Sequence, residues 1–200
     1  MRAHEDGWLV ASADELVDRH IVRGELGCPV CGTRYPVREG VVDFASGSSA
    51  PRAYAALEGM AVRAAALLGL TEPGGMVVLA GEWSAAASEM LEMTENVQLL
   101  ALDYARGLRS GAALSLALIA DVLPLAASSA RGVALDTAHA TPALLQGAAR
   151  ALIAGGRLIA PSTAAVPDSL QELARDDEHW VATTSAQTNV SAPVTIGVRR

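Results

Sequence analysis

The feature that most constrains this chain is the alternation, from Arg52 onward, of short apolar runs with helical stretches. Short apolar runs bounded by turns are typical of buried strands, and the stretches between them suit the helices that connect parallel strands. We predict strands over residues 76–80, 97–102, 114–120, 132–135 and 157–160. This order indicates an α/β fold whose parallel sheet is built from βαβ units.

Apolar residues at three- and four-residue spacings predict helices over residues 52–68, 84–93 and 141–154, with a weaker pattern over 105–112. The helix over 141–154 has the best boundary signals, with Thr141 as N-cap, Pro142 in the first turn and Gly155 beyond the end. A further short helix is predicted near Pro167. Segments 179–184 and 194–198 are predicted to form an antiparallel hairpin at the end of the sheet.

The N-terminal part has a different pattern of short β segments and turns around Cys28 and Cys31. A chain of 200 residues that is 51% hydrophobic can bury one sizeable core and still carry a small appendage. We therefore expect a ribbon-like segment over residues 1–45, a linker over 46–51 and a main domain over 52–200. The linker prediction rests on its Ser, Gly and Pro content.

Four pieces of the main domain resemble the class I S-adenosylmethionine-dependent methyltransferases. They are VVLAGEW (77–83) as the first strand, LLALDY (99–104) as the second, ADVLPL (120–125) before the fourth, and ALIAGGRLIAPS (151–162) leading into the fifth. The resemblance implies a Rossmann-like doubly wound sheet of about seven strands with an antiparallel last strand. It also implies S-adenosylmethionine as the cofactor.

By this resemblance, the cofactor would lie beyond the carboxyl ends of the strands. Asp103 matches the acid that accepts the ribose hydroxyls, and Asp121 matches the acid that contacts the adenine amino group. Gly81 and Glu82 lie in the first loop, beside the cofactor. Asp136 and His139 follow the fourth strand, where a catalytic base would face the substrate.

The first loop departs from the family pattern of an acid followed by Gly-x-Gly-x-Gly. Only Gly81 remains of the three glycines, Leu79 replaces the acid, and Trp83 brings a large ring to a place that needs bare backbone. Two hypotheses follow. The leading one is a methyltransferase-like enzyme of unknown substrate, and the alternative is a noncatalytic pseudoenzyme that binds a protein partner or a second copy of itself. An unrelated nucleotide-binding protein is disfavoured because no GxGxxG follows the first strand.

Cys28 and Cys31 form a CxxC turn, and the segment 24–44 resembles the second half of the small zinc-ribbon proteins that partner methyltransferases. Ala11 and Asp14 stand where that family places its first Cys pair. Zinc binding would need Asp14, His20 or His4, or the Cys pair of a second chain. A metal-free remnant and a redox pair are the other hypotheses.

Charge and hydropathy limit the partners and the location that we expect for this chain. All 15 basic residues are Arg, and the formal net charge is −7, which argues against an extensive nucleic-acid-binding surface. The most apolar window, residues 111–130, is interrupted by Asp121 and Pro124 and is too short to cross a bilayer. No secretory signal follows the polar N-terminus, so we expect a cytoplasmic location.

Overall fold

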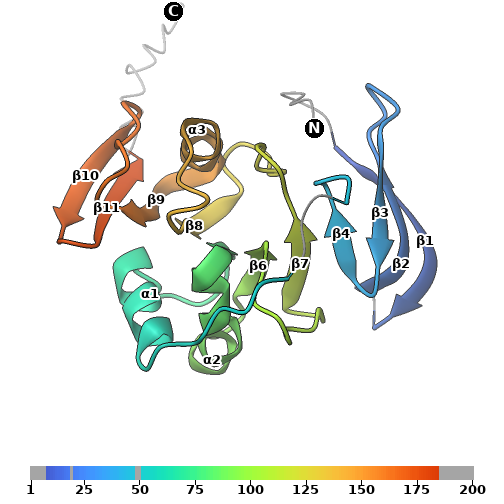
Figure 1. Cartoon of the computed structure of the whole chain (residues 1–200), viewed down its shortest axis with the longest axis horizontal. Helices are drawn as coiled ribbons and strands as arrows, with labels where there is room; N and C mark the ends of the chain where they lie inside the picture. The colour runs from blue at the N-terminus through green and yellow to red at the C-terminus, as the bar shows by residue number, and fades with distance from the viewer. Residues whose placement is uncertain (1–7, 19, 48–50, 185–200) are drawn as a thin grey trace, which may run out of the picture.

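The computed structural model describes residues 8–18, 20–47 and 51–184. Its strands are β1 (Val10–Val17), β2 (His20–Gly27), β3 (Arg34–Arg38), β4 (Val41–Asp43), β5 (Met76–Ala80), β6 (Gln98–Leu102), β7 (Leu114–Leu118), β8 (Ala130–Ala134), β9 (Leu152–Pro161), β10 (Leu170–Arg175) and β11 (His179–Thr184). They form one sheet in the order β1-β2-β3-β4-β7-β6-β5-β8-β9-β11-β10 (Figure 1).

The central part of this sheet is parallel. Strands β7, β6, β5, β8 and β9 run in one direction, while β11 lies antiparallel between β9 and β10. The first strand in the chain to enter this part, β5, lies in its middle, with β6 on one side and β8 on the other. This arrangement confirms the predicted Rossmann-like doubly wound sheet with an antiparallel last strand; the prediction of about seven strands corresponds to β5 to β11, which β1 to β4 extend to eleven.

Helices cover both faces of the sheet (Figure 1). On one face lie α1 (Met60–Leu68), the 3-10 helix η1 (Gly81–Ala86) and α2 (Ala87–Met93), and on the other lies α3 (Pro142–Ala151). Each face has its own apolar cluster, one containing Leu68 and Met90 and the other Leu145 and Trp180. Within the described ranges, no helix is both long and apolar enough to cross a membrane.

The start of α3 follows the sequence signals closely. Thr141 has extended backbone angles, its side chain accepts a hydrogen bond from the Leu144 N–H at 3.3 Å, and Pro142 occupies the first turn. The helix ends earlier than predicted, because β9 begins directly at Leu152. Gly155 lies inside β9 with φ of 74°, where the register between β8 and β9 shifts. Such a conformation strongly favours glycine in this position.

Several predicted elements are wrong or differ in extent. The helix predicted over 52–68 begins only at Met60, after the left-handed Gly59, and residues 105–112 contain no helix. The helix predicted near Pro167 is replaced by β10, which pairs with β11. That pairing takes the place of the predicted hairpin between 179–184 and 194–198, and the latter segment lies outside the described residues.

Strands β1 to β4 form an antiparallel meander, and β4 joins it to the main sheet through parallel pairing with β7. The ladder is short, with Val42 opposite Ala117 at its centre, and the Phe44 N–H extends it by donating to the Leu118 carbonyl. Phe44 also packs against the ring of Tyr35 at a centroid distance of 4.8 Å. The ribbon-like segment therefore continues the sheet beyond its β7 edge.

Replacing Thr141 with Ala should lower the free energy of unfolding by about 1 kcal/mol, because the Leu144 N–H loses its capping acceptor. Urea unfolding of wild type and variant measures the difference. Thr163→Ala is the matched control, since Thr163 is exposed in a turn and its loss should change stability by less than about 0.5 kcal/mol. Equal effects of the two substitutions would contradict the capping role.

Candidate functional site

Three side chains meet at the carboxyl edge of the parallel strands. Asp103 follows β6, and Asp136 and His139 follow β8. The His139 imidazole lies between the two carboxylates, with Nδ1 2.5 Å from Asp136 Oδ1 and Nε2 3.0 Å from Asp103 Oδ2. All three residues are buried, at 7% exposure for Asp103, 5% for Asp136 and 4% for His139. We call this group the carboxyl-edge triad.

Backbone groups hold the two carboxylates in place. Asp136 accepts hydrogen bonds from the backbone N–H of Glu82 at 3.0 Å and of His139 at 3.0 Å. Asp103 accepts one from the Ile119 N–H at 3.1 Å. The N–H donors of Glu82, His139 and Ile119 follow β5, β8 and β7, and Asp103 itself follows β6. The triad therefore links the ends of four neighbouring strands. Buried carboxylates need such partners to offset the loss of hydration.

The first loop fits tightly around the triad. Gly81 has φ of 59°, and a Cβ at this position would overlap the Asp136 carboxylate. The Ser84 hydroxyl donates to the Gly81 carbonyl at 2.5 Å and accepts from the Ala105 N–H at 2.7 Å. Trp83 is only 3% exposed. The loop that would approach a cofactor is therefore folded into η1 and packed into the protein.

Hydrogen bonds and neighbouring charges shift the pKa values of His139 and Asp136 within the triad. Burial alone would lower the pKa of His139, but the hydrogen bonds and charges of Asp103 and Asp136 outweigh it and raise this pKa to about 9. Burial opposes ionisation of Asp136, yet hydrogen bonds from His139 and the Glu82 N–H hold its pKa below the usual value. At neutral pH the triad therefore contains an imidazolium between two carboxylates, and both ring nitrogens donate.

Tyr54 lies near the triad, in the segment that precedes α1. Burial and the nearby charge of Asp136 raise the pKa of its phenol, and Asp103 adds a smaller effect. The Arg52 N–H donates to the Tyr104 carbonyl at 3.2 Å, which attaches this segment to the residues after β6. Sequence reasoning missed Tyr54 because it precedes the first strand and belongs to no recognised motif.

The other predicted cofactor residues lie outside the triad. Asp121 is exposed in a bend after β7, and the Glu82 side chain is exposed although its backbone N–H joins the triad. Asp103 keeps the position predicted for the ribose acid, but His139 occupies one of its carboxylate oxygens. Asp136 and His139, predicted as catalytic residues, have the polar atoms of their side chains directed into this buried group.

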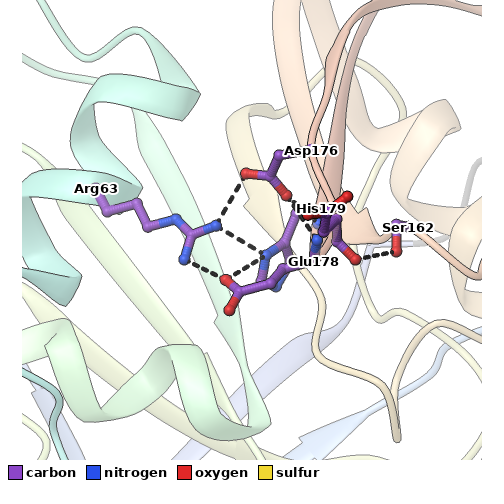
Figure 2. Close-up of polar contacts among 6 residues, drawn as sticks. Arg63, Ser162, Asp176, Glu178 and His179 are labelled. Atoms are coloured by element: carbon purple, nitrogen blue, oxygen red, sulfur yellow. Dashed lines mark hydrogen bonds and ion pairs between the residues drawn. The ribbon is translucent and has the colours of Figure 1, made fainter.

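A cavity of about 370 Å³ opens beside this edge, lined by α1, η1, the end of β9 and the turn before β11. Arg63 of α1 extends across to that turn and binds Asp176 at 3.1 Å and Glu178 at 2.6 Å (Figure 2). Its guanidinium also lies 3.3 Å from His179 Nδ1. Sequence reasoning missed these residues, because Arg63 is more than 110 positions from its partners.

The Cys pair lies in the turn between β2 and β3, with Cys28 buried and Cys31 exposed. The Gly32 N–H donates to the Cys28 carbonyl at 2.8 Å, which closes the turn. No three His, Cys, Asp or Glu side chains of the described ranges group as metal ligands. The structure thus does not bring Asp14 or His20 into a ligand set with the two thiols, and His4 lies outside those ranges. Zinc binding stays a prediction.

No family model matches the sequence, and no match is found among curated proteins. Among solved structures, one similar chain comes from the complex between the Haloferax volcanii Trm112 methyltransferase activator and a candidate methyltransferase, with 25% identity over 52% of this chain and 54% of that one (TM-score 0.40). A candidate methyltransferase from Bacillus halodurans is 15% identical over 50% and 49% of the two chains (TM-score 0.40).

A candidate S-adenosyl-L-methionine-dependent methyltransferase from Methanococcus maripaludis is 9% identical over 66% of this chain and 87% of that chain (TM-score 0.46). The chain spans about half the length of the first two of these structures. Its own strand order, with β5 central and β11 antiparallel, is that of a Rossmann-like doubly wound sheet.

The raised pKa of His139 predicts a pH-dependent stability. Below about pH 6.5 the imidazole is protonated in both folded and unfolded chains, so the full stabilisation is present. As pH rises through about 9, the folded protein loses that proton and the stabilisation disappears. The free energy of unfolding should fall by on the order of 3 kcal/mol across this window.

Urea unfolding at several pH values measures this slope, and His139→Gln should flatten it. His179→Gln is the control, because burial and the charge of Arg63 lower the pKa of His179 and its titration therefore falls below the window. A wild-type slope that persists in His139→Gln would contradict the assignment.

Proposed function

We propose that this chain is a noncatalytic methyltransferase-like protein that serves as a scaffold for a protein partner. The observation that carries the proposal is the position of His139 between Asp103 and Asp136. The His139 ring binds Asp103 Oδ2 and the Ile119 N–H binds Oδ1, so a ribose would have to share or displace the buried contacts of this carboxylate. Removing one member of such a group leaves uncompensated buried charge and typically costs several kcal/mol.

The first loop supports the same proposal. Leu79 is fully buried where the family has an acid for the cofactor's ammonium group, and Trp83 fills the space of a bare turn. Gly81 is the remaining glycine of the pattern, and its missing Cβ makes room for Asp136. These features favour a loop that packs against the protein interior over one that wraps around a cofactor.

The scaffold part of the proposal rests on the free edge of the ribbon-like segment. All eight residues of β1 are exposed, and its apolar side chains include Val10 at 61%, Leu16 at 59% and Val17 at 52% exposure. Trp8, just before the strand, is 79% exposed. An edge strand with exposed apolar side chains is suited to pairing with another chain, which can be a second copy or a different protein.

S-adenosylmethionine-dependent methyl transfer is the second candidate function. It is favoured by Asp103, which lies at the end of β6 where the ribose acid is expected, and by the cavity at the same edge. This function requires the cofactor to share or displace the buried contacts of Asp103 in the carboxyl-edge triad. The two candidates therefore differ in one measurable property, which is affinity for the cofactor.

Calorimetric titration with S-adenosylmethionine and S-adenosylhomocysteine should give no binding heat and no thermal shift at millimolar cofactor. The physical reason is that both oxygens of the buried Asp103 carboxylate already have partners, the His139 ring at Oδ2 and the Ile119 N–H at Oδ1. A dissociation constant in the micromolar range would sink the noncatalytic proposal in favour of methyl transfer.

His139→Ala adds a sharper comparison, because it removes the side chain that competes for Asp103. Any cofactor affinity should be higher in this variant than in wild type, provided that thermal unfolding shows it folded. Ser129→Ala is a control, since Ser129 directly precedes β8, at the opposite end of that strand from the triad, and its hydroxyl donates to the Ala126 carbonyl.

A further inference from the structure

We propose that a second copy of this chain pairs with the outer edge of β1, in an antiparallel ladder formed around a two-fold axis. The proposal rests on the scaffold part of the proposed function and specifies the partner as a second copy. In the resulting homodimer the two sheets become continuous through β1.

The outer edge of β1 offers both backbone groups and apolar side chains. β1 is the terminal described strand at its end of the sheet, so its N–H and C=O groups that point away from β2 have no strand partner among the described residues. Val10, Leu16 and Val17 are 61%, 59% and 52% exposed. A further strand would pair these backbone groups and cover these side chains at the same time.

The sequence of β1, VASADELV, is self-complementary in hydropathy. Large apolar residues stand at both ends, and small or polar residues lie between them. An antiparallel partner related by a two-fold axis through the centre of the strand places Val10 opposite Val17 of the second copy. The same register places Ala11 opposite Leu16. Each contact occurs twice, so both ends of the ladder become apolar.

The ladder between β1 and β2 is irregular around Glu15, but the irregularity does not change this register. Ala13 pairs with Gly24, and Leu16 pairs with Ile21. Leu16 lies three positions after Ala13, and Ile21 lies three positions before Gly24. The two ends of β1 therefore keep the alternation of a regular strand relative to each other.

The charges of β1 are compatible with this pairing. Glu15 lies opposite Ser12 of the second copy, whose hydroxyl can donate a hydrogen bond to the carboxylate. Asp14 lies opposite Ala13. Arg23 of β2 is 4.0 Å from Glu15 and offsets part of its charge. Like charges directly opposite each other would be destabilising, and this register avoids them.

The strand at the other end of the sheet lacks this apolar character. β10 lies at that end (Figure 1), and Leu173 is its only large exposed apolar residue. Glu172 and Arg175 of β10 form an exposed ion pair at 2.7 Å. Charged side chains on an edge strand discourage further pairing. Of the two terminal strands described, β1 is therefore the one suited to a second copy.

Analytical ultracentrifugation of the full chain should show a monomer–dimer equilibrium with a micromolar dissociation constant, as expected for a small interface built on one strand. Hydrogen exchange of the β1 amides should slow as protein concentration rises through this range, because pairing protects the outer N–H groups. Exchange of the β10 amides should not change.

Two substitutions test the register. Val10→Lys and Val17→Glu should each weaken dimerisation roughly tenfold, because the two-fold axis counts each unfavourable cross-strand contact twice. Each variant places a charged side chain opposite a valine of its own second copy. An equimolar mixture of the two variants should restore dimerisation, since their heterodimer contains one Lys–Glu pair and one Val–Val pair.

Leu173→Lys is the matched control, because Leu173 is a 49% exposed apolar residue of the other terminal strand. It should leave the dimer unchanged, and urea unfolding establishes that all variants fold. A full chain that is monomeric throughout the micromolar range would overturn the proposal. So would a dimer that both β1 variants leave intact, or a mixture that fails to restore it.

Cofactor binding distinguishes failure of this proposal from failure of the proposed function. A monomer without affinity for S-adenosylmethionine would overturn the dimer and leave a different protein as the partner of the scaffold. A dimer that follows the expected variant pattern and binds the cofactor with micromolar affinity would support the pairing and contradict the noncatalytic function.

Discussion

A buried contact of one imidazolium with two carboxylates joins the carboxyl ends of the parallel strands. Isolated, each of these charges would be very costly to bury, and the group is stable only because every member is paired and hydrogen-bonded. Its partners come from the ends of β5, β6, β7 and β8. The same contact therefore fixes the sheet edge at which proteins of this fold bind ligands and limits what can bind there.

The strands of the main domain were largely predictable, because most of their residues are apolar and turns separate the short runs. The residues of β5 are all intermediate or buried, and its predicted bounds agree with the structure. Strand β10 was missed because five of its six residues are exposed and polar positions dominate it, so its local pattern suggests a helix. Its conformation depends on pairing with β11, which is a tertiary interaction and overrides local propensity.

The site was predictable residue by residue but not as a group. Asp103 and His139 each follow a predicted strand, and β6 and β8 flank β5, so the order of strands places both at one edge. What the local sequence cannot express is that these side chains bind one another across β5. The same holds for Arg63 and Glu178, which are 115 positions apart. Contacts of this kind follow from the folded geometry alone.

The short ladder between β4 and β7 has a consequence for the ribbon-like segment. The ladder of three residues per strand is by itself too small to hold two separate proteins together at low concentration. Within one chain the two strands have an effective concentration in the millimolar range, independent of how dilute the protein is. Covalent connection thus makes the pairing independent of protein concentration, and among the described strands the end of the sheet on this side is β1 in place of β7.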